Sequence, residues 1–137
     1  MKRTAVVYWS QTGNTEAMAQ AVAASARADL IAAADFAAVK IAEYDAIAFG
    51  CPSMGAEVLE EDTFEPMFAD CLPHLKAFPL ALFGSYGWGD GEWMRAWERR
   101  CLDAGAVLVA APVLCQETPD AAALAACSRL GQKLAAT

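Results

Sequence analysis

A short polar run, Ser10-Gln11-Thr12-Gly13-Asn14-Thr15, has the composition of a site that holds an anion. It combines hydroxyl and amide side chains with a glycine and leads into a segment of helical spacing, so free backbone N–H groups and the positive helix end would face a bound group. No lysine or arginine lies between Arg3 and Arg27, so dipoles alone would hold a phosphate here. The run is neither a Walker A loop nor a G-x-G-x-x-G motif. The alternative interpretation is an ordinary Ser/Thr-rich helix cap.

A second run combines a glycine, a methionine and an acid in Gly50-Cys51-Pro52-Ser53-Met54-Gly55-Ala56-Glu57. A glycine beside a methionine lets the backbone approach a flat ligand closely, because glycine adopts positive φ without penalty. Glu57 offers an acceptor for a ring N–H. The alternative interpretation is an ordinary connecting loop whose acids are solvated.

A third run carries aromatic rings on a glycine-rich loop, Gly84-Ser85-Tyr86-Gly87-Trp88-Gly89-Asp90-Gly91. Glycines add little packing, so a ring presented there is suited to stacking on a planar ligand. The alternative is a Trp88 folded back onto the edge of a sheet. For Trp93 and Trp97 the helical spacing favours packing in the core instead.

Each of these runs follows an apolar stretch of strand length. Continuous apolar character predicts strands buried on both faces, at 4–9, 45–50, 80–84 and 106–114, with a weaker one at 29–33. Helical spacing predicts helices at 14–28, 62–72, 90–105 and 118–134, the second capped by Asp62 with Glu65 and the fourth by Thr118 before Pro119. This β–α alternation predicts an α/β fold with a doubly wound parallel sheet and helices on both faces. Ligands bind such sheets at the carboxyl ends of the strands, where the three runs would meet.

Composition limits the partners. The chain has 137 residues, 17 acidic against 10 basic, a formal charge of −7 and a pI near 4.5, so it would be repelled by nucleic acid and by anionic membranes. The segment that begins at Met1 is too short in apolar residues for a signal peptide, which favours a cytoplasmic location. Five cysteines without C-x-x-C spacing, and a single His74, argue against a disulfide framework and a zinc site. No linker or repeat is visible, so residues 1–137 are expected to form a single domain.

On these residues the chain resembles the short-chain flavodoxins, small electron carriers that bind FMN. The resemblance is carried by residues 8–15, 50–61 and 81–91, and by the overall length, which leaves no room for the extra segment of long-chain members. It implies a flavodoxin-like three-layer sandwich around a five-stranded parallel sheet of order 2-1-3-4-5.

The resemblance also implies which residues bind the cofactor. The phosphate would lie at residues 10–15, the ribityl chain beside Trp9, and the ring system between Met54 and Trp88, with Glu57 accepting the flavin N3 hydrogen. Backbone N–H groups of residues 85–91 would meet the pyrimidine end. The full set of expected FMN-binding residues is Trp9, Ser10, Gln11, Thr12, Gly13, Asn14, Thr15, Pro52, Ser53, Met54, Gly55, Ala56, Glu57, Ser85, Tyr86, Gly87, Trp88, Gly89, Asp90 and Gly91.

The implied function is that of a low-potential one-electron carrier without substrate turnover of its own. Its partners would be reductases and oxidoreductases that dock transiently on an acidic flavin edge, since Glu57 to Asp70 contain six acids and no base, and the carrier would be a monomer. An FMN-dependent quinone or azo reductase and a dedicated activator of one enzyme remain alternatives. A phospho-receiver is disfavoured, because Tyr8, Trp9 and Ser10 stand where it needs an acidic pair.

One position departs from the usual pattern of the family. In flavodoxins the peptide at the position of Gly55-Ala56 turns over on reduction, and the flipped type II turn needs positive φ at Ala56. Alanine resists that conformation by about 1 kcal/mol. We therefore expect a lower first-electron potential here than in a relative with glycine at this position.

Overall fold

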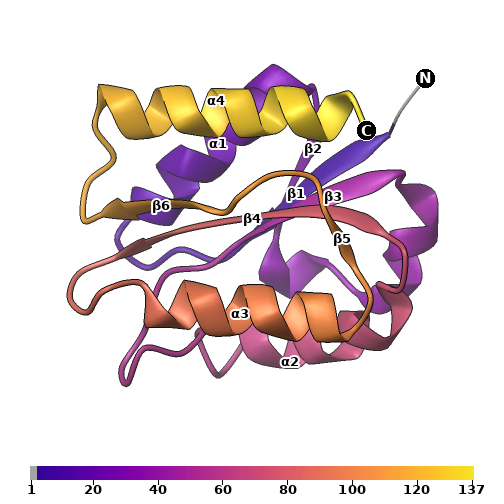
Figure 1. Cartoon of the computed structure of the whole chain (residues 1–137), viewed down its shortest axis with the longest axis horizontal. Helices are drawn as coiled ribbons and strands as arrows, with labels where there is room; N and C mark the ends of the chain where they lie inside the picture. Colours follow the sequence, from indigo (N-terminus) through magenta and orange to yellow (C-terminus); the bar gives the residue numbers. More distant parts are fainter. Residues whose placement is uncertain (1–2) are drawn as a thin grey trace.

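The chain folds around one parallel sheet covered by helices on both faces (Figure 1). The computed structural model describes residues 3–137; Met1 and Lys2, where the expectation about the leader begins, lie outside the described residues. The strands run in the order β2 (Asp29–Ala32), β1 (Thr4–Tyr8), β3 (Ala46–Gly50), β4 (Pro79–Tyr86) and β5 (Val107–Leu108), with β6 (Val113–Gln116) also paired to β4. The predicted fold class and strand order are confirmed.

The central strands are buried on both sides, as their unbroken apolar character predicts. β1 (Thr4–Tyr8) and β3 (Ala46–Gly50) pair in register from Thr4 with Ala46 to Tyr8 with Gly50. β2 (Asp29–Ala32) forms one edge and is more exposed. β4 (Pro79–Tyr86) is longer than predicted and carries Ser85 and Tyr86 within the strand.

The last position of the sheet differs from the prediction of one strand over 106–114. It is divided into β5 (Val107–Leu108), beside the start of β4, and β6 (Val113–Gln116), beside its end. Pro112 stands in the interruption. Proline has no N–H to donate to a sheet, so an apolar run alone overstated the length of the strand.

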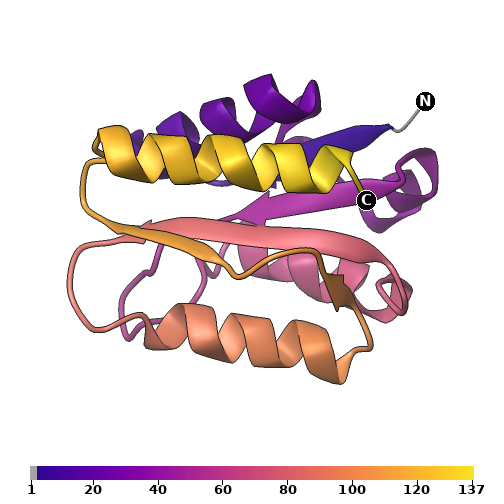
Figure 2. The same ribbon diagram turned by 45° about the horizontal axis from the view of Figure 1, so that its top comes forward.

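The helices form two layers (Figure 2). α1 (Asn14–Ala26) and α4 (Ala121–Ala135) cover one face, while α2 (Phe64–Cys71) and α3 (Glu92–Asp103) cover the other. The first pair packs small residues and Met18 on the sheet, and the second packs Phe64, Phe68 and Trp97. Between β2 and β3 the expected α-helix of a regular repeat is replaced by two 3-10 helices, η1 (Ala33–Asp35) and η2 (Ala38–Glu43); a third, η3 (Leu72–His74), follows α2.

Two of the predicted helix caps are wrong. Thr63, not Asp62, is the N-cap of α2, and the side chain that satisfies the amides there is the buried Glu60. At α4 the N-cap is Asp120, whose Oδ1 accepts from the Ala123 amide at 2.8 Å, instead of Thr118. At α4 the acid replaces the expected hydroxyl because a carboxylate is the stronger acceptor. At α2 the expected cap was itself an acid, and Glu60 takes its place because its carboxylate lies within 2.8 Å of three amide nitrogens of that turn.

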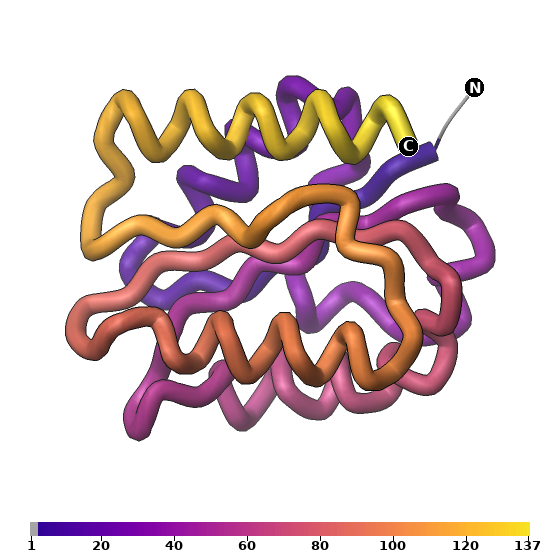
Figure 3. The backbone as a smooth tube through the Cα atoms, in the orientation of Figure 1, coloured from indigo at the N-terminus to yellow at the C-terminus, as the bar shows by residue number. Residues whose placement is uncertain are grey.

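The loops that the sequence singled out gather at one end of the molecule. In Figure 3 the turns after β4 and β6 lie at the left, while the start of β1 and the C-terminus lie at the right. The parallel strands all point toward the left end, so their carboxyl ends meet there.

Candidate functional site

A cavity of about 280 Å³ opens at the carboxyl edge of the sheet. Three predicted loops and one further segment line it. The lining residues are Ser10, Gln11, Thr12, Asn14, Thr15, Pro52, Ser53, Met54, Ser85, Tyr86, Gly87 and Glu117. The fold therefore brings together the polar run after β1, the start of the loop after β3 and the end of β4.

The loop after β1 forms a cradle of unpaired donors. Gly13 has a φ of 94° and ends the loop at the N-terminus of α1. The Ser10 hydroxyl accepts from the amides of Gly13 and Glu16, both at 3.2 Å. Four further amides at the tip of the loop and the start of α1, those of Gln11, Thr12, Asn14 and Thr15, have no acceptor among residues 3–137. Unpaired N–H groups at a helix N-terminus are suited to an anion, so this cradle fits a phosphate group.

The loop after β3 closes into a tight turn over residues 54–58. The amide of Met54 donates to the Val58 carbonyl at 2.8 Å, and Val58 donates back at 3.0 Å. Gly55 and Glu57 have φ values of 48° and 57°, while Ala56 does not adopt positive φ. Gly55 and Ala56 are exposed at the tip of this turn.

Glu57 has an unsatisfied carboxylate oxygen. Its Oε1 and the Nε1 of Trp97 are the buried side-chain polar atoms that lack a hydrogen-bond partner in the described part of the chain. The Glu57 carboxylate also lies against Gly89, where any Cβ would overlap Oε1. A buried acceptor without a donor is costly, so this atom fits a ligand that brings an N–H group.

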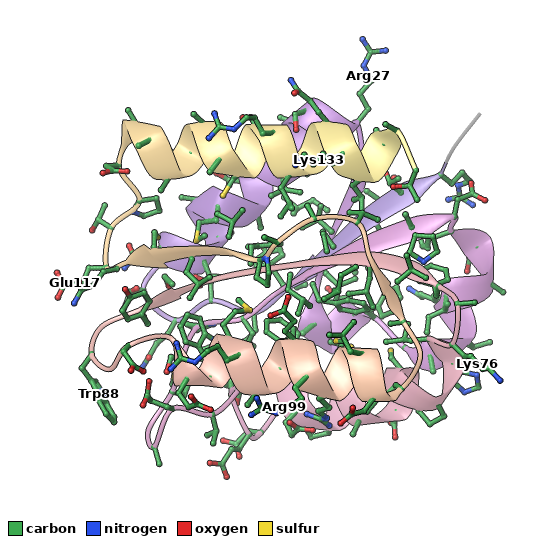
Figure 4. All side chains as sticks on the ribbon, in the orientation of Figure 1. Arg27, Lys76, Trp88, Arg99, Glu117 and Lys133 are labelled. Atoms are coloured by element: carbon green, nitrogen blue, oxygen red, sulfur yellow. The ribbon has the colours of Figure 1, made fainter. Side chains whose placement is uncertain are left out.

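The two aromatic residues of the third run differ in their surroundings. Tyr86 packs on Trp93 with ring centroids 5.4 Å apart, whereas Trp88 is 62% exposed and projects from the end of the molecule (Figure 4). The alternative of a Trp88 folded onto the sheet edge is therefore wrong for this structure, and the predicted burial of Trp93 and Trp97 is confirmed. Asp90 pairs with Arg95 at 2.8 Å, and Gly91 is the N-cap of α3 with a φ of 93°.

Trp9 lies to the side of the main cavity. It lines a neighbouring hollow of about 270 Å³ together with Tyr8, Ser10 and Glu16. The Tyr8 hydroxyl donates to Glu16 Oε2 at 3.2 Å, and burial together with that carboxylate raises the pKa of Tyr8. Gly13, the tip of the 54–58 turn, Glu57 and residues 88–91 do not line the main cavity; Glu57 lines a separate hollow of about 150 Å³ together with Trp97 and Arg100.

Sequence reasoning missed the segment after β6. Glu117 lines the cavity, and its amide donates to the Tyr86 carbonyl at 2.8 Å. Gln116 Nε2 donates to the Gly87 carbonyl at 3.3 Å, and Figure 4 shows Glu117 at the same end as Trp88. The signal available in the sequence was position alone, because residues 116 and 117 follow the last apolar stretch and so reach the same edge.

The acidic stretch from Glu57 to Asp70 is less uniformly exposed than expected. Glu60 is only 6% exposed, and its carboxylate accepts hydrogen bonds from backbone amides. Glu65 is paired with Arg100 of α3, at 2.6 Å for Oε2 and Nη2. Arg100, which lies outside the stretch, thus neutralises one of its six acids, while Glu61, Asp62 and Asp70 remain exposed.

The thiols are buried rather than reactive. Cys51, Cys71, Cys101 and Cys127 are buried, Cys115 is half-buried, and all five are free. Burial raises the pKa of Cys51, whose Sγ accepts from the Glu60 amide at 3.4 Å. Cys51 therefore helps to hold the loop after β3, as a small buried side chain. His74 is exposed, as predicted.

Comparison with known proteins matches this geometry to one family. A family model described as flavodoxin matches residues 6–131. Flavodoxin from Megasphaera elsdenii is 45% identical over 95% of this chain and 96% of its own, and flavodoxin from Clostridium beijerinckii is 41% identical over 95% of this chain and 97% of its own. The chain belongs to the flavodoxin family.

A solved structure agrees with this assignment. The solution structure of two-electron reduced Megasphaera elsdenii flavodoxin superposes with a TM-score of 0.89 at 42% identity, covering 98% of this chain and 99% of that one. As a flavodoxin, the chain is an FMN-dependent electron-transfer protein and not an enzyme with its own substrate turnover. It transfers electrons to redox partner proteins. No helix within residues 3–137 is long and apolar enough to cross a membrane.

Proposed function

We propose that FMN binds in the cavity at the carboxyl edge of the sheet, with its phosphate in the cradle of residues 10–15. The observation that carries this proposal is the set of four unpaired amides at Gln11, Thr12, Asn14 and Thr15. The nearest Lys or Arg in the sequence is outside this loop, so these dipoles and the N-terminus of α1 supply the attraction. FMN, when bound, accepts and returns electrons one at a time.

The remaining residues would orient the ring system. Met54 lines the cavity on one side, and the exposed Trp88 lies on a loop that can cover the other. The buried Glu57 Oε1 would accept the N3 hydrogen, which would satisfy an atom that otherwise has no donor. The amides of residues 85–91 would meet the pyrimidine end, and Trp9 would flank the ribityl chain.

Glu57 would also tune the cofactor toward a low potential. A carboxylate about 4 Å from an added negative charge disfavours that charge by roughly 4 kcal/mol at an effective dielectric near 20. Because Glu57 is half-buried and forms no salt bridge within the part of the chain that the structure describes, little there offsets this repulsion. The carrier would accordingly be a strong reductant.

The partner surface would be the open end around Trp88. Glu117 is exposed at the same end as Trp88 (Figure 4), and Glu61 and Asp62 are exposed on the loop before α2; their charge favours basic partners in a small, transient complex of a monomeric carrier. We expect electron transfer to a basic redox partner to slow as ionic strength rises, because salt screens such steering. A rate that stays constant between low and high salt would contradict this part of the proposal.

Residues 1–137 would act as a single FMN-binding domain. Both hydrophobic clusters pack against the same sheet, one on each face. Five free thiols suit a reducing compartment, which supports a cytoplasmic location.

Titration of the FMN-free protein with FMN and with riboflavin tests the proposed site. Riboflavin carries the same ring system without the phosphate. Charge-assisted hydrogen bonds contribute roughly 1.5–3 kcal/mol each, so FMN should bind at least about a hundredfold more tightly. Equal affinity for the two flavins would place the phosphate outside the cradle.

A further inference from the structure

Two hydroxyl groups meet at the edge of the cavity, one from a helix and one from a strand of the sheet. Thr15 lies in the first turn of α1, and Ser85 lies near the end of β4. Their Oγ1 and Oγ atoms are 2.9 Å apart. Both residues line the cavity, yet Thr15 is only 1% and Ser85 only 5% exposed, so this is a built contact and not a surface encounter.

Counting protons restricts what this pair can do. Each hydroxyl has one proton to donate, and each can accept from other groups. Within residues 3–137, neither hydroxyl has another side-chain or backbone hydrogen-bond partner. One proton therefore lies between the two oxygens, and the other is available to a group in the cavity.

The direction of the bond decides which proton is available. If Thr15 donates to Ser85, Thr15 presents only lone pairs to the cradle, and the proton of the buried Ser85 lacks an acceptor. If Ser85 donates to Thr15, the Ser85 proton is satisfied and the Thr15 proton is free to point into the cradle. Leaving a buried donor unpaired is unfavourable, so the second arrangement is preferred once an acceptor is present.

The surroundings of Thr15 select the same direction when an anion binds. Its own amide is among the four unpaired N–H groups of the cradle, so the Thr15 hydroxyl lies among groups that can only donate hydrogen bonds to a bound anion. A phosphate dianion offers acceptors alone. The Thr15 hydroxyl would donate its proton to the phosphate, and a lone pair of Thr15 Oγ1 would accept the proton of Ser85.

We infer that Ser85 is a positioning residue for the phosphate: its hydroxyl donates to Thr15 Oγ1 and so directs the Thr15 proton at the anion. This inference rests on the proposed function, because it requires the phosphate to lie in the 10–15 cradle. The Ser85 carbonyl accepts from the Ser53 amide at 2.9 Å, and that bond does not involve the side chain. Removing the hydroxyl should therefore leave the loop connection intact.

Binding of FMN and riboflavin to FMN-free variants tests the inference. Ser85→Ala should weaken FMN binding by about tenfold, as expected for a lost hydrogen bond that supports a charged group. Riboflavin binding should change by less than about twofold, because riboflavin lacks the group that the Thr15 proton serves. In a Thr15→Val background, Ser85→Ala should cause no further loss of FMN affinity. Thr15→Ser, which keeps the hydroxyl, should retain most of it.

Two results would overturn the inference. Equal losses of FMN and riboflavin affinity in Ser85→Ala would indicate a structural role, and an undiminished loss in the Thr15→Val background would show that Ser85 does not act through Thr15. Ser85→Cys, which keeps the size and weakens the donor, should fall between wild type and Ser85→Ala and guards against a misfolded alanine variant. Ser128→Ala on α4 is the matched control and should match wild type. If wild type itself binds both flavins equally, the proposed phosphate site fails, a result distinct from failure of Ser85 alone.

Discussion

Glu65 of α2 and Arg100 of α3 form a bidentate salt bridge, with Oε1 2.7 Å from Nη1 and Oε2 2.6 Å from Nη2. The guanidinium also lies over the Phe68 ring, 5.3 Å from its centroid. The hydrogen bonds to the Glu65 carboxylate raise the pKa of Arg100, so the guanidinium stays charged. This contact joins the two helices beneath the site and removes one acid from the surface that a partner can meet.

A double-mutant cycle should measure that contact. Because both side chains are about one-third exposed, solvent screens the pair. We expect a coupling energy of only about 0.5–1.5 kcal/mol between Glu65→Gln and Arg100→Gln. Urea unfolding of the wild type, the two single variants and the double variant gives this value, and it should shrink at high salt. Strictly additive losses would show that the two side chains do not interact in solution.

Glu60 should contribute more to stability than an exposed acid. Its carboxylate accepts from the amides of Asp62, Thr63 and Phe64 at 2.7–2.8 Å. Glu60→Ala leaves these donors without a partner at the start of α2 and should lower the free energy of unfolding by about 1–3 kcal/mol. Glu61→Ala, one residue away and exposed, is the control. Equal denaturation midpoints for the two variants would contradict the capping role.

Gly131 allows α4 to approach α1. A Cβ at this position would overlap the Ser25 hydroxyl and the Val22 carbonyl oxygen. Gly131→Ala should destabilise the fold by about 1–3 kcal/mol, although the same change on an open helix surface is stabilising. Ser25→Ala combined with Gly131→Ala should recover only part of the loss, since the carbonyl remains. A stabilised Gly131→Ala protein in thermal unfolding would rule out the close contact.

Alkaline pH should destabilise the protein through its buried thiols. Burial raises the pKa of Cys101 and of Cys127 from 9.0 to about 12. A raised folded pKa means that the stabilisation is complete below the unfolded value near 9 and is lost as pH rises toward 12. The free energy of unfolding should therefore fall between these limits, by at most about 1.4 kcal/mol per pH unit for each thiol. Urea titrations at increasing pH measure it, and Cys127→Ala should flatten the curve; a pH-independent stability above pH 9 would contradict it.

Ala56→Gly should raise the first-electron potential. Ala56 avoids positive φ in this structure, whereas Gly55 adopts it, and the flipped turn would require it at position 56. Relief of about 1 kcal/mol corresponds to roughly 40 mV. Potentiometric titration of the FMN-loaded variant measures the shift, with the exposed Ala42→Gly as control. An unchanged potential would show that the turn does not pass through that conformation.

The sequence was informative where a residue's role depends on neighbours along the chain. The buried strands and the loops after them follow from local apolar runs and turn residues, so the edge that carries the cavity could be predicted. The roles of Glu60 and Glu65 could not be predicted in this way. The Glu60 side chain turns inward to accept from amides at the start of α2, and Glu65 pairs with an arginine 35 residues away in the sequence. The lining by Glu117 depends on how β6 is shifted after the break at Pro112, which an apolar pattern does not encode.

Anaerobic stepwise reduction of the purified, FMN-loaded protein, followed by visible absorption and by release of the cofactor with acid, tests whether the protein carries single electrons on bound FMN. We expect an equimolar yield of FMN, reduction in separate one-electron steps, and no NAD(P)H consumption by the protein alone. A protein that does not take up FMN, or one that oxidises NAD(P)H steadily without a partner, would contradict it.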